Sequence, residues 1–133
     1  SGIEALKKSK KVSGKIKLVG VTTLTSLNDN ALKEIGYKRN VRTLVEHQAK
    51  LAAKAKLDAI VCSPHELKLV RKLFKGEIIT PGIRLNSELN DQKRVMSPKR
   101  AVAMGCDWLV IGRSITRGNI KKNTQNLINH LFK

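Results

Sequence analysis

The chain has 133 residues, a length that fits one domain, and 41% of them are hydrophobic, which is enough for a real core. Lys and Arg number 27 against 10 Asp and Glu, giving a formal net charge of +17 that favours anionic partners. No run of 18 apolar residues occurs, and residues 1–12 lack the apolar core of a signal peptide, so we expect a cytoplasmic protein without membrane contact.

Helical and strand patterns alternate along the whole chain. Apolar residues at helical spacing predict helices at residues 3–12, 29–35, 41–56, 63–74, 97–104 and 120–132. Short apolar runs predict strands at residues 17–22, 57–62, 77–80 and 107–111. Ser63 and Ser97 each precede a proline and are expected to cap helices, and Glu66 would complete a capping box with Ser63. This order predicts an α/β fold with about four parallel strands.

Cysteines and histidines give no sign of a disulfide framework or a metal site. Cys62 and Cys106 both fall at or just before a predicted strand, where we expect them to be reduced and buried. The histidines His47, His65 and His130 are scattered, and no CxxC or HxxxH spacing occurs. We therefore predict no metal.

Glycines, arginines and hydroxyl residues follow the predicted strands. These strand-end groups are Thr25 with Ser26, Ser63, residues 81–84 including Pro81 and Arg84, and Gly112 with Arg113. Because the carboxyl ends of parallel strands meet at one edge of a sheet, these groups are expected on one face. Gly-containing loops offer backbone N–H groups and Arg a planar fork, and Gln92 adds a neutral donor between the last two strands. The pattern predicts an anion site, most often one for phosphate.

Each of these residues also has a plainer interpretation. Arg84 and Arg113 would be solvated surface charges if they pointed away from the edge. Ser63 fits a helix cap better than a ligand, and Thr25 would bond within its own loop. The Gly-x-Arg spacing is weak alone, and the prediction depends on the combined order of the segments.

The segments together resemble a known family, bacterial orotidine 5'-phosphate decarboxylase. The similar stretches are residues 21–26 (VTTLTS), 61–66 (VCSPHE), 80–84 (TPGIR), 90–94 (NDQKR) and 111–116 (IGRSIT). The resemblance implies a (β/α)8 TIM barrel, usually dimeric, with its site at the dimer interface. It also implies decarboxylation of orotidine 5'-phosphate to UMP, in pyrimidine biosynthesis, without any cofactor.

The same resemblance assigns substrate-binding roles to six residues. By likeness, Thr25 would line the substrate pocket and Pro81 would lie near the pyrimidine. The remaining four would hold the substrate, mainly at its phosphate: Arg84, Gln92, Gly112 and Arg113.

The chain departs from the family pattern in one large respect. It resembles only the second half of the barrel, so residues 1–133 are expected to form a single C-terminal half-barrel domain. The family's catalytic D-x-K-x-x-D stretch has no counterpart, because Asp91-Gln92-Lys93 lacks an Asp three residues after the Lys. We therefore expect no catalytic residue here and no activity from this chain alone.

Half a barrel predicts an incomplete assembly. Four strands cannot close, so the inner face would stay apolar and two strand edges bare. Either a separate N-terminal half-barrel chain or a second copy, as a homo-oligomer, is expected to cover them.

Three functions stay open on the sequence alone. The first is the substrate-binding half of the decarboxylase, and the second is a catalytically inactive relic that binds a nucleotide or another phosphorylated ligand. The third, nucleic-acid binding through the +17 charge, ranks last because the lysines are dispersed and aromatic residues make up only 3%.

Overall fold

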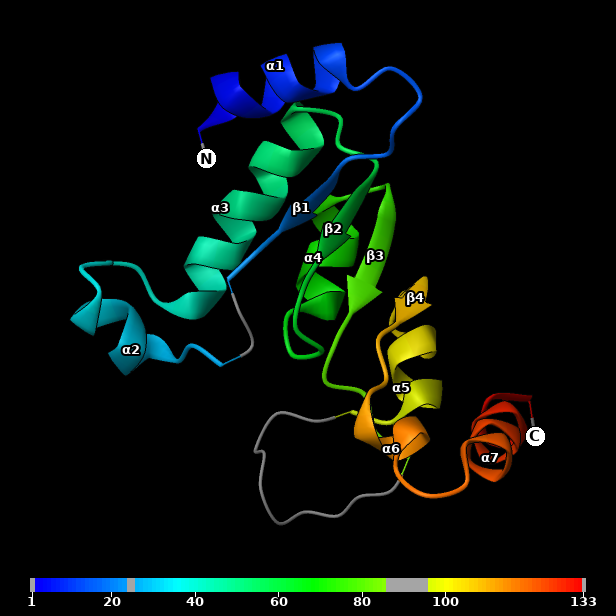
Figure 1. Ribbon diagram of the computed structural model, residues 1–133. Helices are drawn as coiled ribbons and strands as arrows, with labels where there is room; N and C mark the ends of the chain where they lie inside the picture. The colour runs from blue at the N-terminus through cyan, green and yellow to red at the C-terminus, as the bar shows by residue number, and fades with distance from the viewer. Residues whose placement is uncertain (1, 24–25, 86–95, 133) are drawn as a thin grey trace.

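The computed structural model describes residues 2–23, 26–85 and 96–132 (Figure 1). Within them, helices and short strands alternate, which confirms the predicted α/β class. In chain order the elements are α1 (Ile3–Val12), β1 (Val19–Val21), α2 (Asp29–Glu34), α3 (Val41–Lys54), β2 (Ala59–Val61), α4 (Leu67–Leu73), β3 (Glu77–Thr80), α5 (Pro98–Ala103), β4 (Trp108–Leu109), α6 (Arg113–Thr116) and α7 (Ile120–Phe132).

The four strands form one parallel sheet in the order β1-β2-β3-β4. One row of residues crosses the whole sheet: Val21 pairs with Val61, Val61 with Ile79, and Ile79 with Trp108. Because every strand runs the same way, all the carboxyl ends lie at one edge. The segments that follow β3 and β4 therefore meet there.

Helices α3, α4 and α5 cover one face of this sheet and enclose the core with it. On β3, Ile78 and Thr80 are fully buried on that face, while the alternate residues Glu77 and Ile79 are only half-buried. Such alternation follows from the two-residue period of a strand. The buried residues of α3, namely Val41, Leu44, Val45, Ala49 and Ala52, repeat at helical spacing and form its inner stripe.

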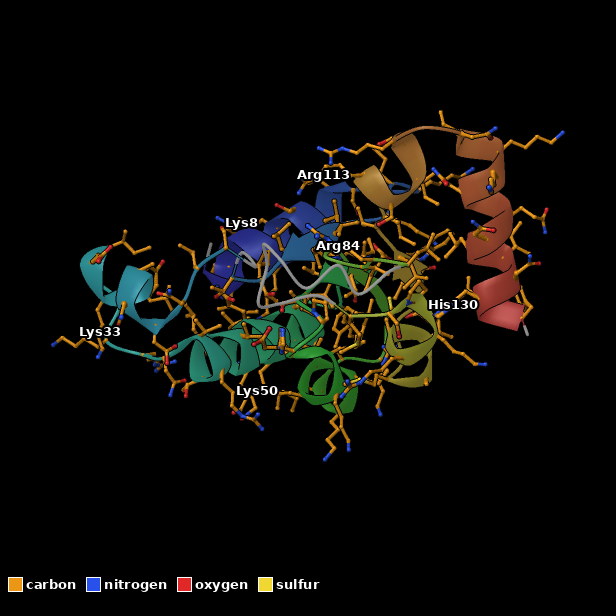
Figure 2. All side chains as sticks on the ribbon, turned by 90° about the horizontal axis from the view of Figure 1, so that it is seen from below. Lys8, Lys33, Lys50, Arg84, Arg113 and His130 are labelled. Atoms are coloured by element: carbon orange, nitrogen blue, oxygen red, sulfur yellow. The ribbon has the colours of Figure 1, made fainter. Side chains whose placement is uncertain are left out.

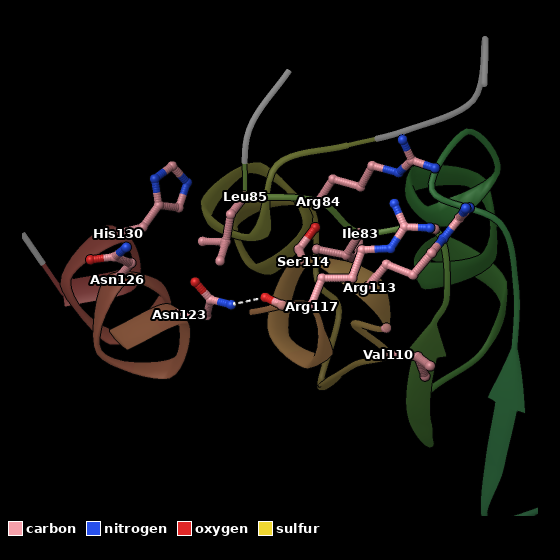
Figure 3. A pocket seen from close by; sticks show the side chains of 12 residues that line it. Ile83, Arg84, Leu85, Val110, Arg113, Ser114, Arg117, Asn123, Asn126 and His130 are labelled. Atoms are coloured by element: carbon pink, nitrogen blue, oxygen red, sulfur yellow. Dashed lines mark hydrogen bonds between the residues drawn. The ribbon is translucent and has the colours of Figure 1, made fainter. Parts of the chain in front are cut away.

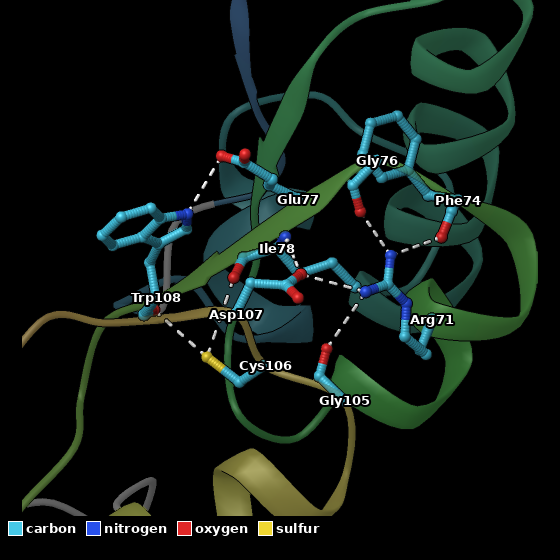
Figure 4. Close-up of polar contacts among 9 residues, drawn as sticks. All are labelled: Arg71, Phe74, Gly76, Glu77, Ile78, Gly105, Cys106, Asp107 and Trp108. Atoms are coloured by element: carbon cyan, nitrogen blue, oxygen red, sulfur yellow. Dashed lines mark hydrogen bonds and ion pairs between the residues drawn. The ribbon is translucent and has the colours of Figure 1, made fainter.

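The opposite face of the sheet is largely apolar, and the described residues leave part of it exposed. Val21 on β1 is 62% exposed, and Trp108 on β4 is 58% exposed. Glu77 lies on the same face, where its carboxylate accepts from Lys17 Nζ at 2.8 Å and from Trp108 Nε1 at 3.0 Å (Figure 4). The outer edges of β1 and β4 have no neighbouring strand in the part of the chain that the structure describes.

Local sequence signals explain several helix ends. Asn40 caps α3 by accepting from Thr43 N at 2.8 Å, and Ser97 caps α5 by accepting from Arg100 N. Gly105 ends α5 with a φ of +95°, the left-handed conformation that glycine adopts most easily.

The predicted start of α4 is wrong by several residues. The hydroxyl of Ser63 accepts from His65 N at 3.3 Å and its carbonyl from Glu66 N, so residues 64–66 form a turn and the helix begins at Leu67. Glu66 makes no capping hydrogen bond; its side chain is buried, and its Oε2 has no hydrogen-bond partner among the described residues. The short helix α6 was not predicted at all.

Both cysteines are free and buried, as expected. Burial, aided by the nearby Glu66 carboxyl, raises the pKa of the Cys62 thiol to about 12. No described helix is long and apolar enough to cross a membrane.

Candidate functional site

A cavity of about 650 Å³ lies at the carboxyl edge of the sheet (Figure 3). Its walls come from three parts of the chain: residues 82–85 after β3, residues 110–117 at and after the end of β4, and helix α7. The last two strands of the sheet and the final helix therefore build it together.

The first wall is held in place by backbone contacts. Gly82 has a φ of +80°, a conformation that residues with a side chain adopt at a cost. Its carbonyl accepts from Met96 N at 3.3 Å, and Arg84 N donates to Met96 O at 3.1 Å. Ile83, 3% exposed, anchors this bridge in the core. Arg84 is thus fixed at its backbone while its side chain reaches the cavity.

The second wall begins where β4 ends. Val110 N donates to Thr80 O at 3.0 Å, which extends the pairing to the rim of the cavity. A Cβ built on Gly112 would meet nothing within 4 Å, so packing does not require glycine here and the backbone is open to a ligand. Ile115 N and Thr116 N both donate to Gly112 O, so the amides of Arg113 and Ser114 come before the first intrahelical bonds.

Helix α7 forms the third wall. Asn123 Nδ2 donates to Ile115 O at 3.1 Å and to Arg117 O at 2.7 Å, which fixes the end of α6 against α7. Asn126 and His130 continue the same helix face along the cavity. Nε2 of His130 is buried without a hydrogen-bond partner among the described residues.

The electrostatics of the cavity favour an anion. Arg84, Arg113 and Arg117 all line it, and its described lining contains no carboxylate. In Figure 3 the three guanidinium groups are turned to one side of the cavity, while Asn126 and His130 lie on the other. Guanidinium forks with nearby backbone amides are the donors that phosphate and carboxylate groups bind best.

The structure brings three of the six predicted site residues together: Arg84, Gly112 and Arg113 line one cavity. Pro81 is half-buried beside Gly82 but is not part of the described lining. Thr25 and Gln92 lie outside the described residues. Ser63 is buried and bonded within its own turn, which agrees with a structural role.

Sequence reasoning missed Arg117 and the residues of α7. Arg117 follows Arg113 by four residues and is the residue at which the short helix α6 ends. Asn123, Asn126 and His130 repeat at intervals of three and four, the spacing of one helix face. The spacing on α7 indicates a polar helix face, but it does not indicate that this face lines the cavity.

Two other kinds of site, a metal site and a basic surface for nucleic acid, find no support in the described residues. No group of three or more His, Cys, Asp or Glu side chains there is placed to hold a metal ion. The lysines are spread over many elements: Lys8, Lys33 and Lys50 project from α1, α2 and α3 in different directions (Figure 2).

Several known proteins are similar to this chain in sequence. Residues 1–125 match the sequence profile of the orotidine 5'-phosphate decarboxylase / HUMPS family. The chain is 50% identical over 103 residues to orotidine 5'-phosphate decarboxylase of Coxiella burnetii, covering 75% of this chain and 44% of that protein. It is 45% identical over 116 residues to the decarboxylase of Geobacter metallireducens, covering 85% and 48%.

Solved structures give the same relationship. The decarboxylase of Lactobacillus acidophilus superposes with a TM-score of 0.80 at 27% identity, covering 99% of this chain and 60% of that one. The enzyme of Methanocaldococcus jannaschii, solved with the inhibitor BMP, has the same fold at a TM-score of 0.69 and 22% identity, covering 99% of this chain and 58% of its own. The chain spans about half the length of the curated relatives it matches. It belongs to the orotidine 5'-phosphate decarboxylase / HUMPS family, and its four-stranded sheet matches part of that family's barrel.

Proposed function

We propose that this chain supplies the phosphate-binding half of an orotidine 5'-phosphate decarboxylase, which converts orotidine 5'-phosphate to UMP and CO2. The observation that carries the proposal is the convergence of Arg84, after β3, and Arg113, after β4, on one cavity beside Gly112. The relatives at 45–50% identity, which are named as this decarboxylase, support the choice of nucleotide.

Each residue has a separate part in this proposal. Arg113 presents its fork to two phosphate oxygens, and Gly112 leaves room for the phosphate to approach the backbone. Arg84, from the segment after β3, adds a second positive charge on the same side of the cavity. Gln92 and Thr25 would add polar contacts and Pro81 would lie near the pyrimidine, as the family resemblance implies.

The proposal assigns no catalytic residue to this chain. Residues 1–133 contain no D-x-K-x-x-D stretch, and Asp91-Gln92-Lys93 is followed by Arg94, Val95 and Met96. Binding of the phosphate end alone would not protonate the carbanion left by CO2. The carboxylate and lysine groups for that step must then come from outside these residues.

We also propose that the exposed sheet face is covered in the working protein. Val19, Val21, Trp108 and Val110 are each about half exposed or more, and they lie on or beside one face of the sheet. Exposed apolar patches with bare strand edges associate readily. An N-terminal half-barrel is the favoured cover, since the relatives are about twice as long, and a second copy of this chain is the alternative.

Light scattering tests the cover directly. A second copy predicts a dimer of about twice the 14.8 kDa of this chain, and an N-terminal half predicts a 1:1 complex when that half is added. If the chain stays a monodisperse monomer and does not bind the added half, neither a second copy nor an N-terminal half covers this face.

The activity itself is tested by complementation. We expect no decarboxylation of orotidine 5'-phosphate by this chain alone, and activity when residues corresponding to the missing half of a relative are supplied in trans or by fusion. Arg113→Ala in the complemented protein should raise KM strongly, while Arg42→Ala, an exposed change on α3, should not. A folded complex without any activity would favour the second candidate, a nucleotide-binding relic, which should still bind UMP.

A further inference from the structure

Arg113 and Arg117 form a pair of like charges one turn apart. Arg117 N donates to Arg113 O at 3.1 Å, so Arg117 closes the single turn of α6 that Arg113 begins. Like charges so close together repel one another, and Arg84 adds a third positive group to the same cavity. No carboxylate in the described part of the chain pairs with any of the three. The arrangement is unfavourable until an anion binds.

Two hydrogen bonds from α7 hold the backbone at the end of α6, although Arg117 itself is exposed. Asn123 Nδ2 bonds the carbonyl of Arg117 at 2.7 Å and that of Ile115 at 3.1 Å. Asn119 Oδ1 in turn accepts from Lys122 N at the start of α7, which fixes the helix that carries Asn123. A side chain on a fixed backbone loses less freedom when it binds a ligand.

We infer that Arg117 is a third phosphate-binding residue, positioned by Asn123 and acting with Arg84 and Arg113 on a phosphomonoester dianion. The inference deepens the proposed function, and it rests on it in taking the anion to be a phosphate ester. Two guanidinium groups carry the two positive charges that neutralise a dianion. The third provides an excess of positive charge, which favours the dianion over the monoanion.

Calorimetric titration of the full chain with inorganic phosphate and with UMP tests the inference. Arg117→Ala should weaken the binding of both about tenfold or more, because a hydrogen bond between charged groups is lost. Arg42→Ala removes an arginine side chain from α3, outside the cavity, and should leave both affinities within about twofold of the wild type. Since Arg117 is exposed and removing it relieves repulsion, the Arg117→Ala variant should fold with a melting temperature no lower than that of the wild type.

A pH series separates contact with phosphate from a structural role. The second pKa of a phosphate ester is about 6, so the loss in Arg117→Ala should be larger at pH 7.5, where the dianion dominates, than at pH 5.5. Equal affinity of the wild type and Arg117→Ala, or an equal loss at both pH values, would overturn the inference. Phosphate binding that depends on Arg117, without binding of UMP, would overturn the nucleotide function and leave the anion site standing.

Discussion

Arg84 and Met96 are joined through their backbones, with Arg84 N donating to Met96 O at 3.1 Å. The bond connects the residue that enters the cavity from β3 to the residue that leads into α5. A second bond, from Met96 N to Gly82 O at 3.3 Å, makes the connection a two-bond clamp. The placement of Arg84 in the cavity therefore depends on the conformation of Gly82, whose φ is +80°.

Replacing Gly82 by Ala should weaken both folding and ligand binding. A side chain at positive φ costs about 1–2 kcal/mol, which should lower the free energy of unfolding in urea. Relaxing φ would move the carbonyl that Met96 N bonds and shift Arg84, so the affinity for UMP should fall as well.

Gly36→Ala is the matched control for that experiment. Gly36 has a φ of +89° and no atom within 4 Å of an added Cβ, and it lies beyond α2 outside the described cavity lining. It should lose similar stability and keep the affinity for UMP. A Gly82→Ala protein that binds UMP as tightly as Gly36→Ala would refute the role of the clamp.

Arg71 and Asp107 connect the end of α4 to the start of β4 (Figure 4). Arg71 donates to Asp107 at 3.0 Å and to the carbonyls of Phe74, Gly76 and Gly105, and Asp107 also accepts from Ile78 N at 2.7 Å. Arg71→Ala should lower the free energy of unfolding by about 1–3 kcal/mol, because several carbonyls lose a charged donor in a partly exposed site.

Lys72→Ala, the neighbouring exposed cation on α4, provides the comparison in urea unfolding. It removes a positive charge without any of these bonds and should change stability by less than about 0.5 kcal/mol. If the two variants unfold at the same urea concentration, the connection contributes nothing.

Asp58 links α1 to the sheet in a way that depends on pH. Lys10 Nζ donates to both carboxylate oxygens, at 2.6 and 2.7 Å, and Leu18 N donates at 2.7 Å, which together hold the pKa of Asp58 below its ordinary value. A carboxyl whose pKa is lower in the folded state stabilises the fold above its unfolded pKa of about 3.9. That contribution disappears as the pH falls through the folded pKa.

Melting temperatures across pH should show this contribution. Asp58→Asn should melt below the wild type at pH 7, and the difference should shrink as the pH falls below about 3.9. Glu34→Gln, which removes an exposed carboxylate from α2, should show no such pattern. A constant difference between Asp58→Asn and wild type at every pH would contradict the linkage.

The sequence predicted the fold well because its signals were local. Asn40, Ser97 and Gly105 each fix a helix end with their own side chain or φ, and the structure has them as expected. Ser63 shows the limit: the same cap-and-proline pattern produced a turn, in which Ser63 accepts from the amides of His65 and Glu66, and α4 begins only at Leu67.

The candidate site could likewise be predicted only in part from the sequence. Arg84, Gly112 and Arg113 could be placed because parallel strands bring their carboxyl ends together. The wall formed by α7 could not be placed, because it depends on the bonds from Asn123 to α6, and no local pattern specifies which helices pack together.

Trp108, the only tryptophan of the chain, reports on the uncovered sheet face. It is 58% exposed, and its indole N–H donates to Glu77 at 3.0 Å on the face that we propose to be covered.

The fluorescence of Trp108 should be that of a hydrated indole in the isolated monomer and should shift to shorter wavelength when the complementing half or a second copy binds. Trp108→Ala should weaken that association by about 2 kcal/mol or more, roughly 30-fold in Kd, because a large exposed aromatic side chain is removed from the proposed interface. Tyr37→Ala removes another aromatic residue, 48% exposed and beyond α2, and should leave the association unchanged. An emission that stays at the hydrated wavelength in a proven complex would place the interface elsewhere.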